Sequence, residues 1–157
     1  MHIAKKANIE VFATGGIGGV HRGVGQSFDI SQDLAALSRI SMVVVSAGAK
    51  SILDLPKTVE LLETLGVSMV GFKTSEFPSF YSRSSGIKRV TKVNSVKKIS
   101  EVFLNNRFLE TLGATLVLNP TPAESEIPIE IMDPLIHSAM AELNKRGIGG
   151  KMVTPFS

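Results

Sequence analysis

Short apolar runs alternate along this chain with longer segments in which apolar residues recur at helical spacing. The runs of strand length cover residues 9–13, 42–45, 67–72 and 114–118. The segments with helical spacing cover residues 29–39, 51–65, 95–112 and 129–146. Because strands and helices alternate, the pattern predicts an α/β fold, a layered α/β/α arrangement around a mainly parallel sheet.

Proline and glycine residues mark the starts, bends and ends of the predicted helices. Pro56 suits the first turn of a helix, Pro134 predicts a bend in the last helix, and Gly66 and Gly113 mark helix ends. Residues 73–85 hold five serines and a proline, which predicts a long loop. Residues 1–7 resemble the last turn of a helix, and residues 153–157 stop where another element is expected. We therefore expect residues 1–157 to form a single α/β domain that is incomplete at both ends.

Composition narrows the class of protein. The chain has 157 residues, 43% of them hydrophobic, with no cysteine and a formal net charge of +3. No apolar run is long enough to span a bilayer and no signal peptide is evident, so we expect an intracellular protein without a membrane partner. Five lysines and arginines lie between residues 88 and 98 without interleaved aromatic residues, which favours a solvated surface over nucleic-acid binding.

Ligands of parallel α/β sheets bind beyond the carboxyl ends of the strands, so the segments that follow the predicted strands are the candidate site. Residues 14–23 follow the first strand and are rich in glycine. Amides of Gly15 and Gly16 could bind a phosphate, with Thr14 adding a hydroxyl, although a flexible turn has the same composition. His21 lies in this loop and could contact a substrate.

Two further segments carry reactive side chains. Asp29 and Asp33 would share a helical face if the helix begins early, and they could then hold a hard divalent cation; from the spacing alone, helix capping is the favoured explanation. Lys50 follows the second strand among small residues. It could serve as a Schiff-base nucleophile, or it could be an exposed lysine ahead of a helix. Residues 76–82 could enclose a ring-shaped ligand or simply pack as a loop.

The motifs in their order along the chain resemble those of pseudouridine-5'-phosphate glycosidases, also called the indigoidine-synthase-A-like family. The similarity covers essentially the whole chain. The matching runs are VFATGGIGGVHRG (11–23), FDISQDL (28–34), AGAKSILD (47–54), EFPSFYSRSSG (76–86), Asn119-Pro120 with Glu126-Ile127-Pro128, and GKMVTPF (150–156).

The resemblance implies reversible cleavage of the C–C glycosidic bond of pseudouridine 5'-phosphate into ribose 5-phosphate and uracil. Lys50 matches the family's imine-forming lysine, and Asp29 matches its position for Mn²⁺ or another divalent cation. Ser31, Gln32 and Asp33 match a substrate-binding stretch, in which Gln32 departs from the family's usual alanine. A homo-oligomer, a trimer in the family, is also implied.

The resemblance also implies that some catalytic groups lie elsewhere. The family's proton-donating glutamate and a second substrate-contacting lysine belong to an N-terminal portion, and an asparagine-bearing segment follows at the C-terminal end. We therefore assign no general acid here. Two alternatives stay open: a non-catalytic fragment that binds a nucleotide, a sugar phosphate or a partner subunit, and a different Schiff-base enzyme such as an aldolase.

Overall fold

The computed structural model describes residues 1–148 and contains one five-stranded sheet in which every pairing is parallel. The strand order is β1-β2-β5-β3-β4, so the last strand in the sequence lies in the middle of the sheet. The strands are β1 (Val11–Ala13), β2 (Val43–Ser46), β3 (Ser68–Phe72), β4 (Thr91–Val93) and β5 (Thr115–Leu118). The predicted α/β class and parallel sheet are confirmed.

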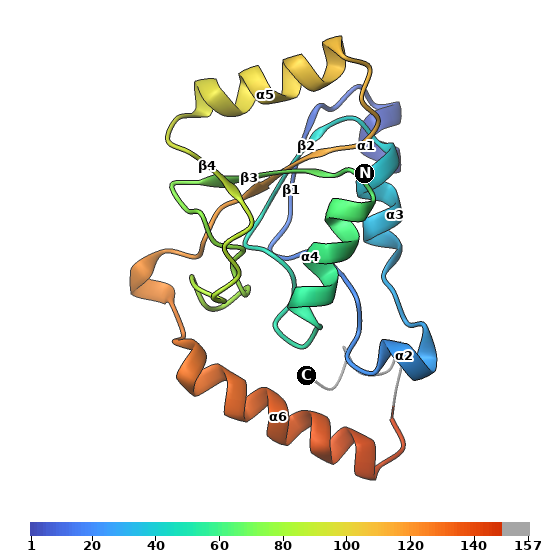
Figure 1. The fold of residues 1–157 in the computed structure, drawn as a ribbon, viewed down its shortest axis with the longest axis vertical. Coiled ribbons are helices and arrows are strands. Elements are labelled where there is room, and N and C mark those ends of the chain that lie inside the picture. The colour runs from blue at the N-terminus through green and yellow to red at the C-terminus, as the bar shows by residue number, and fades with distance from the viewer. Residues whose placement is uncertain (149–157) are drawn as a thin grey trace.

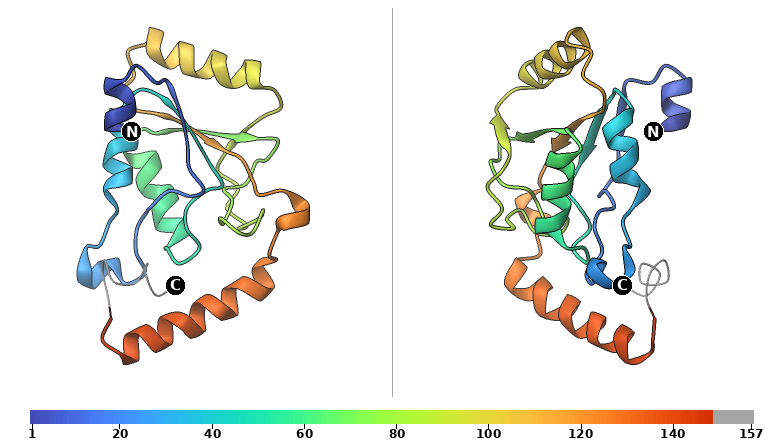
Figure 2. Two further views of the ribbon diagram at one scale, coloured as in Figure 1. Left: turned by 180° about the vertical axis from the view of Figure 1, so that it is seen from behind. Right: turned by 45° about the vertical axis from the view of Figure 1, so that its right-hand side comes forward.

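Helices cover both faces of the sheet, as the layered prediction required (Figures 1 and 2). The helices are α1 (His2–Lys6), α2 (Val24–Ser27), α3 (Gln32–Arg39), α4 (Leu55–Thr64), α5 (Val96–Phe108) and α6 (Ile129–Lys145), with a 3₁₀ turn at Ala123–Ser125. No described helix is long and apolar enough to cross a membrane. The predicted family run at residues 150–156 lies outside the described residues.

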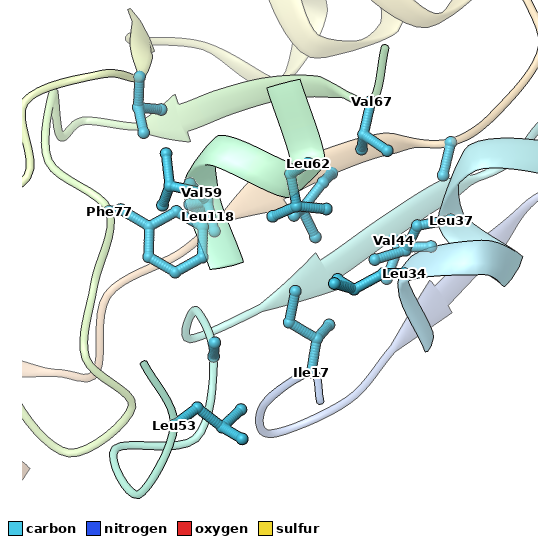
Figure 3. Close-up of a cluster of buried hydrophobic side chains, with 14 of the residues drawn as sticks. Ile17, Leu34, Leu37, Val44, Leu53, Val59, Leu62, Val67, Phe77 and Leu118 are labelled. Atoms are coloured by element: carbon cyan, nitrogen blue, oxygen red, sulfur yellow. The ribbon is translucent and has the colours of Figure 1, made fainter. Parts of the chain in front are cut away.

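The main core lies between the sheet and the helices α3 and α4. Leu34 and Leu37 of α3 and Leu62 of α4 are almost completely buried, and they pack with Val44 and Leu116 of the central strands (Figure 3). Burying aliphatic side chains of this size contributes about 1.5–3 kcal/mol each to stability. The opposite face carries a smaller buried cluster beneath α5.

Three sequence predictions are wrong in detail. The helix expected at residues 29–39 begins at Gln32, because the Ser31 side chain caps it. The helix expected from residue 51 begins at Leu55, because the Asp54 carboxylate accepts the Lys57 amide. Strand β4 was not predicted: it has three residues, its middle residue is Lys92, and it pairs only with β3 at the edge of the sheet.

Candidate active site

The glycine-rich segment after β1 is an extended loop held on both sides rather than a free turn. Along one side, the Ile17 amide donates to Gly48 O (2.9 Å) and the Lys50 amide donates to Ile17 O (3.1 Å). On the other side, the Ser31 amide donates to Gly19 O (2.9 Å). The loop therefore continues the pairing of β1 with β2 past the ends of both strands.

Glycine is needed in this loop because neighbouring groups approach its backbone closely. A Cβ on Gly16 would lie 2.5 Å from the Phe80 ring, and one on Gly18 would lie 2.2 Å from the Ser31 hydroxyl. The amides of Gly15 and Gly16 donate to no acceptor within residues 1–148. They remain available to an anion, so close packing and anion binding are compatible uses of the same loop.

Four of the predicted substrate-binding residues line one cavity. Thr14 and Gly16 reach it from the loop, and Gln32 and Asp33 reach it from the first turn of α3, around a volume of about 360 Å³. Asp33 also has a structural role, because its Oδ2 accepts the Gly18 amide at 2.7 Å. Ser31 caps α3 by accepting the Asp33 amide at 3.2 Å. The Asp33 side chain and the Ser31 backbone amide, which donates to Gly19 O, attach the glycine loop to the helix.

Lys50 lines a second and larger cavity, of about 590 Å³, at the end of β2. The walls come from the loop after β2, from Phe80 and Tyr81, and from one side of α6. Among residues 1–148, Lys50 is the single charged residue in these walls. The other lining residues are hydroxyl-bearing or apolar: Ser51, Ile52, Phe80, Tyr81, Ile127, Met132, Leu135, Ile136, Ala139, Met140 and Leu143. A primary amine beside a mainly apolar cavity suits addition to a carbonyl carbon.

Residues 78–82 pack closely against the segment that carries Lys50. Gly48 has a φ of +93°, and a Cβ there would lie 2.0 Å from Pro78 O. The Ser51 hydroxyl donates to Ser79 O at 2.7 Å. Phe80 adopts a φ of +57° and stacks edge-on against Tyr81, with the ring centroids 4.5 Å apart. A bulky residue in the left-handed region is costly, and such conformations cluster at functional sites.

Glu76 shapes the other end of the same loop. It accepts hydrogen bonds from the Ser84 hydroxyl and from the Gly86 amide. The bond from Ser84 is the main cause that lowers the pKa of the Glu76 carboxyl below its ordinary value. Only part of residues 76–82 therefore lines a cavity. Phe80 and Tyr81 line the Lys50 cavity, whereas Glu76 stabilises the conformation of the loop.

His21 and Asp29 form a separate pair on the far side of the glycine loop. Their Nδ1 and Oδ2 atoms lie 3.8 Å apart, and the His21 amide donates to Asp29 O at 3.0 Å. The expectation that Asp29 shares a helical face with Asp33 is wrong, because Asp29 precedes the helix and Ile30 pairs with Val20. Asp29 and Asp33 therefore do not form a cation site on one face of α3.

The His21–Asp29 pair offers a divalent cation few protein ligands. Within residues 1–148, no three histidine, aspartate or glutamate side chains come together as a ligand set. Asp29 and His21 offer one carboxylate and one imidazole, both partly exposed. Mn²⁺ accepts this donor chemistry when water or substrate oxygens supply the remaining ligands. The pair therefore fits a shared site, completed by substrate, and not a closed protein cage.

Sequence reasoning missed the contribution of α6. Figure 1 shows this helix lying across the end of the sheet, where the segments after β1 and β2 emerge. Asp133 of α6 lies 3.9 Å from the Arg22 guanidinium, which also donates at 3.5 Å to the carbonyls of Ser51 and Leu53. The pattern of apolar residues predicted a helix over residues 129–146 but not its position, and Met132, Ile136 and Leu143 of this helix line the Lys50 cavity.

The predicted site residues thus lie in or near the glycine loop, at three separate places. Lys50 borders the large cavity, Thr14, Gly16, Gln32 and Asp33 border the smaller one, and His21 pairs with Asp29. Gly15 lies in the same loop, exposed. The two cavities share no lining residue: Gly16 and Ile17 of the loop line the smaller one, and Lys50, whose amide donates to Ile17 O, lines the larger one.

Comparisons with known proteins match the whole chain. The sequence profile of the family described as "Indigoidine synthase A like protein" matches residues 1–157. A protein of Dinoroseobacter shibae named pseudouridine-5'-phosphate glycosidase is 51% identical over 99% of this chain and 51% of its own length. Another of that name, from Caldanaerobacter subterraneus, is 47% identical over 99% of this chain and 51% of its own length.

Two solved structures share the fold. An indigoidine synthase A-like protein from Thermotoga maritima superposes with a TM-score of 0.87 at 42% identity, over 99% of this chain and 50% of that one. The prealnumycin C-glycosynthase AlnA, in complex with ribulose 5-phosphate, superposes with a TM-score of 0.92 at 35% identity, over 99% of this chain and 51% of that one. This chain therefore spans about half the length of the relatives it matches.

Proposed function

Because this chain belongs to the indigoidine synthase A-like family, we propose that it carries the imine-forming half of a C-glycosidase active site. The proposed reaction is reversible cleavage of pseudouridine 5'-phosphate to ribose 5-phosphate and uracil. The position of Lys50 carries the proposal, because this residue borders a mainly apolar cavity at the carboxyl end of β2. The names of the relatives support the substrate.

Lys50 is proposed as the nucleophile because a C–C glycosidic bond has no leaving oxygen that an acid could protonate. The amine forms a bond to C1' of the ribose as the C1'–O4' bond breaks and O4' takes a proton, which opens the sugar ring. Uracil then takes a proton at C5 as the C1'–C5 bond breaks, and the electron pair of the amine nitrogen forms the C1'=N bond of the protonated imine. Water hydrolyses the imine, which frees Lys50 and releases ribose 5-phosphate. The proton donor is not assigned to a residue of this chain.

The glycine loop is proposed to hold the phosphate end of the substrate. Thr14 and Gly16 line the same cavity as Gln32, and the amides of Gly15 and Gly16 donate to no acceptor within residues 1–148. Backbone amides grouped in a loop bind anions without adding a charged side chain. Asp33 is occupied with the Gly18 amide, so its proposed contribution to substrate binding is to position the loop.

We further propose that Asp29, with His21 beside it, holds a divalent cation such as Mn²⁺. A bound cation there would supply positive charge to oxygen atoms of the sugar phosphate. Asp29 would anchor the ion through its carboxylate, and His21 would orient that carboxylate or share in the binding. The homotrimer expected from the family resemblance stays a prediction.

Reductive trapping tests the Lys50 assignment directly. The chain is incubated with ribose 5-phosphate, reduced with borohydride, digested and mapped by mass spectrometry. We expect a ribose-phosphate adduct on Lys50 and none in Lys50→Arg, because a guanidinium forms no stable imine. Lys57→Arg, on the exposed N-terminal turn of α4, is the matched control and should leave the adduct on Lys50 unchanged. An adduct spread equally over surface lysines would contradict the assignment.

A second candidate function follows from the length of the chain. Since it spans about half of its relatives, it could bind a sugar phosphate or nucleotide without turning it over. Calorimetry with pseudouridine 5'-phosphate and Mn²⁺, paired with an assay for uracil release, separates the two functions. Binding without release of uracil would favour the second candidate.

A further inference from the structure

A third cavity lies beyond the carboxyl ends of β3 and β5, away from the glycine loop. Lys73 follows the last residue of β3, and Pro120 lies two residues after β5. Together with Lys92 of β4 and Arg83 of the loop that joins β3 to β4, they line a volume of about 270 Å³. This β3–β5 cavity shares no lining residue with the cavity of Lys50 or with the smaller cavity beside the glycine loop.

The lining of the β3–β5 cavity carries more positive than negative charge. Lys73, Arg83 and Lys92 come from three separate segments, so the fold and not a run of basic sequence brings them together. Glu76 is the one carboxylate residue of the lining within residues 1–148. Its carboxylate already accepts hydrogen bonds from the Ser84 hydroxyl and from a backbone amide of the same loop. The excess positive charge favours an anionic ligand.

The chain turns sharply after β3 and leaves backbone amides without acceptors. A Cβ on Gly71 would lie 2.2 Å from Thr74 O, so the turn folds back against the strand. Lys73 adopts a φ of +60°, and its amide donates to Val93 O at 2.7 Å. The next two amides, of Thr74 and Ser75, donate to no acceptor within residues 1–148. Free amides beside cationic side chains are the donors that an oxyanion accepts.

Arg83 is held in place by the segment that follows β5. Its guanidinium donates to Thr121 O, and its amide donates to Glu126 Oε1 at 2.9 Å. Figure 1 shows this segment beside the loop between β3 and β4. The other guanidinium N–H groups have no acceptor among residues 1–148. A guanidinium that is already positioned loses little conformational freedom when it binds a ligand.

We propose that the β3–β5 cavity binds a phosphate group, as inorganic phosphate or as the phosphate of a small ester. The Arg83 guanidinium suits two oxygens of one phosphate, and Lys92 adds a point charge. Ligands of parallel α/β sheets bind beyond the carboxyl ends of the strands, where this cavity lies. The site is separate from the glycine loop proposed for the substrate phosphate, and it does not depend on that assignment.

Amide chemical shifts test the proposal residue by residue. The full chain, isotope-labelled for NMR, is titrated with inorganic phosphate at constant ionic strength and, in a second arm, with ribose 5-phosphate. We expect saturable shifts of the Thr74, Ser75 and Ser84 amides in at least one arm. Equal affinity in both arms would show that the phosphate group is the whole ligand. A higher affinity in one arm would identify the free anion or the ester as the preferred ligand.

Substitutions that remove one charge locate the ligand. Arg83→Gln and Lys92→Gln should each weaken binding about fivefold or more, because each removes a charge-assisted contact with the phosphate. Lys6→Gln is the matched control, because Lys6 is exposed in α1, ahead of the opposite edge strand β1; its affinity should change less than about twofold. Thermal unfolding checks that each variant is folded. If Arg83→Gln does not fold, Lys92→Gln decides the outcome.

Three results would overturn the proposal. One is the absence of saturable shifts at Thr74, Ser75 and Ser84 with both probes. Another is equal weakening by Lys6→Gln and Lys92→Gln, which would indicate general attraction to a basic protein. The third is a set of shifts confined to the glycine loop, which would place the only phosphate site there. Absence of shifts in the glycine loop alone would count against the proposed substrate-phosphate site and not against this one.

Discussion

At the scale of single residues, the candidate site depends on places where the backbone leaves no room for a side chain. Gly48 combines a positive φ with a Pro78 carbonyl at the position that a Cβ would take. This contact lies two residues before Lys50 and joins the loop after β2 to the loop that carries Phe80. The position of the Lys50 backbone therefore depends on Gly48, a residue that has no side chain.

Substitution of Gly48 should show this dependence. Gly48→Ala should destabilise the fold by about 2–4 kcal/mol, because the methyl group meets backbone and the φ is unfavourable for alanine. Gly25→Ala is the matched control: its Cβ would meet nothing within 4 Å, and it lies in α2. Urea unfolding of both variants measures the difference. Equal stability of the two would contradict the steric account.

At the scale of the element, α4 begins where Asp54 caps it. Burial raises the pKa of the Asp54 carboxyl, but the hydrogen bonds and charge of Lys57, with Arg22 nearby, outweigh burial and leave the pKa below its ordinary value. Folding therefore favours the ionised form. The resulting stabilisation is present above the unfolded-state pKa, about 3.9, and is lost as the pH falls through the lower folded-state pKa.

Asp54→Asn removes this ionisation while keeping a side chain that can cap the helix. We expect the variant to be less stable than the parent at pH 7 and to approach it in stability at pH 3. Urea unfolding at both pH values measures the two free energies. A difference that stays constant with pH would show that the carboxylate charge contributes nothing.

At the scale of the whole molecule, α6 is held over the site by the loop that precedes it. The buried Ser82 hydroxyl donates to Ile127 O at 2.7 Å, and the Ile127 amide donates to Tyr81 O at 3.0 Å. These bonds join the Phe80–Tyr81 segment to the start of α6. One wall of the Lys50 cavity is thereby attached to another.

Ser82→Ala should loosen this attachment. Loss of the hydroxyl leaves the Ile127 carbonyl without that donor, which costs about 1–3 kcal/mol. Amide hydrogen exchange should accelerate in α6 more than in α4. Ser100→Ala, whose hydroxyl bonds only within α5, is the control and should leave exchange in α6 unchanged. Uniform acceleration across both helices would indicate global destabilisation instead.

Local pattern predicted much of this protein before its structure. Four of the five strands and the bodies of α3, α4, α5 and α6 follow from apolar periodicity and from Gly and Pro positions, because these are properties of neighbouring residues. The placement of Lys50 after a buried strand followed from the same pattern. The roles of Asp29 and Lys50 came from the ordered motifs, and they stay predictions.

Tertiary structure decided what depends on residues far apart in the sequence. Strand β4 exists because β3 offers it an edge, and its own three residues carry no clear pattern. Lys50 lines one cavity whereas Thr14 and Gln32 line another, although all three follow or border the carboxyl ends of neighbouring strands. The sequence by itself determined the elements and the candidate residues, because periodicity is local. Only the fold decided which of those residues share a cavity, because packing brings together positions that no local pattern connects.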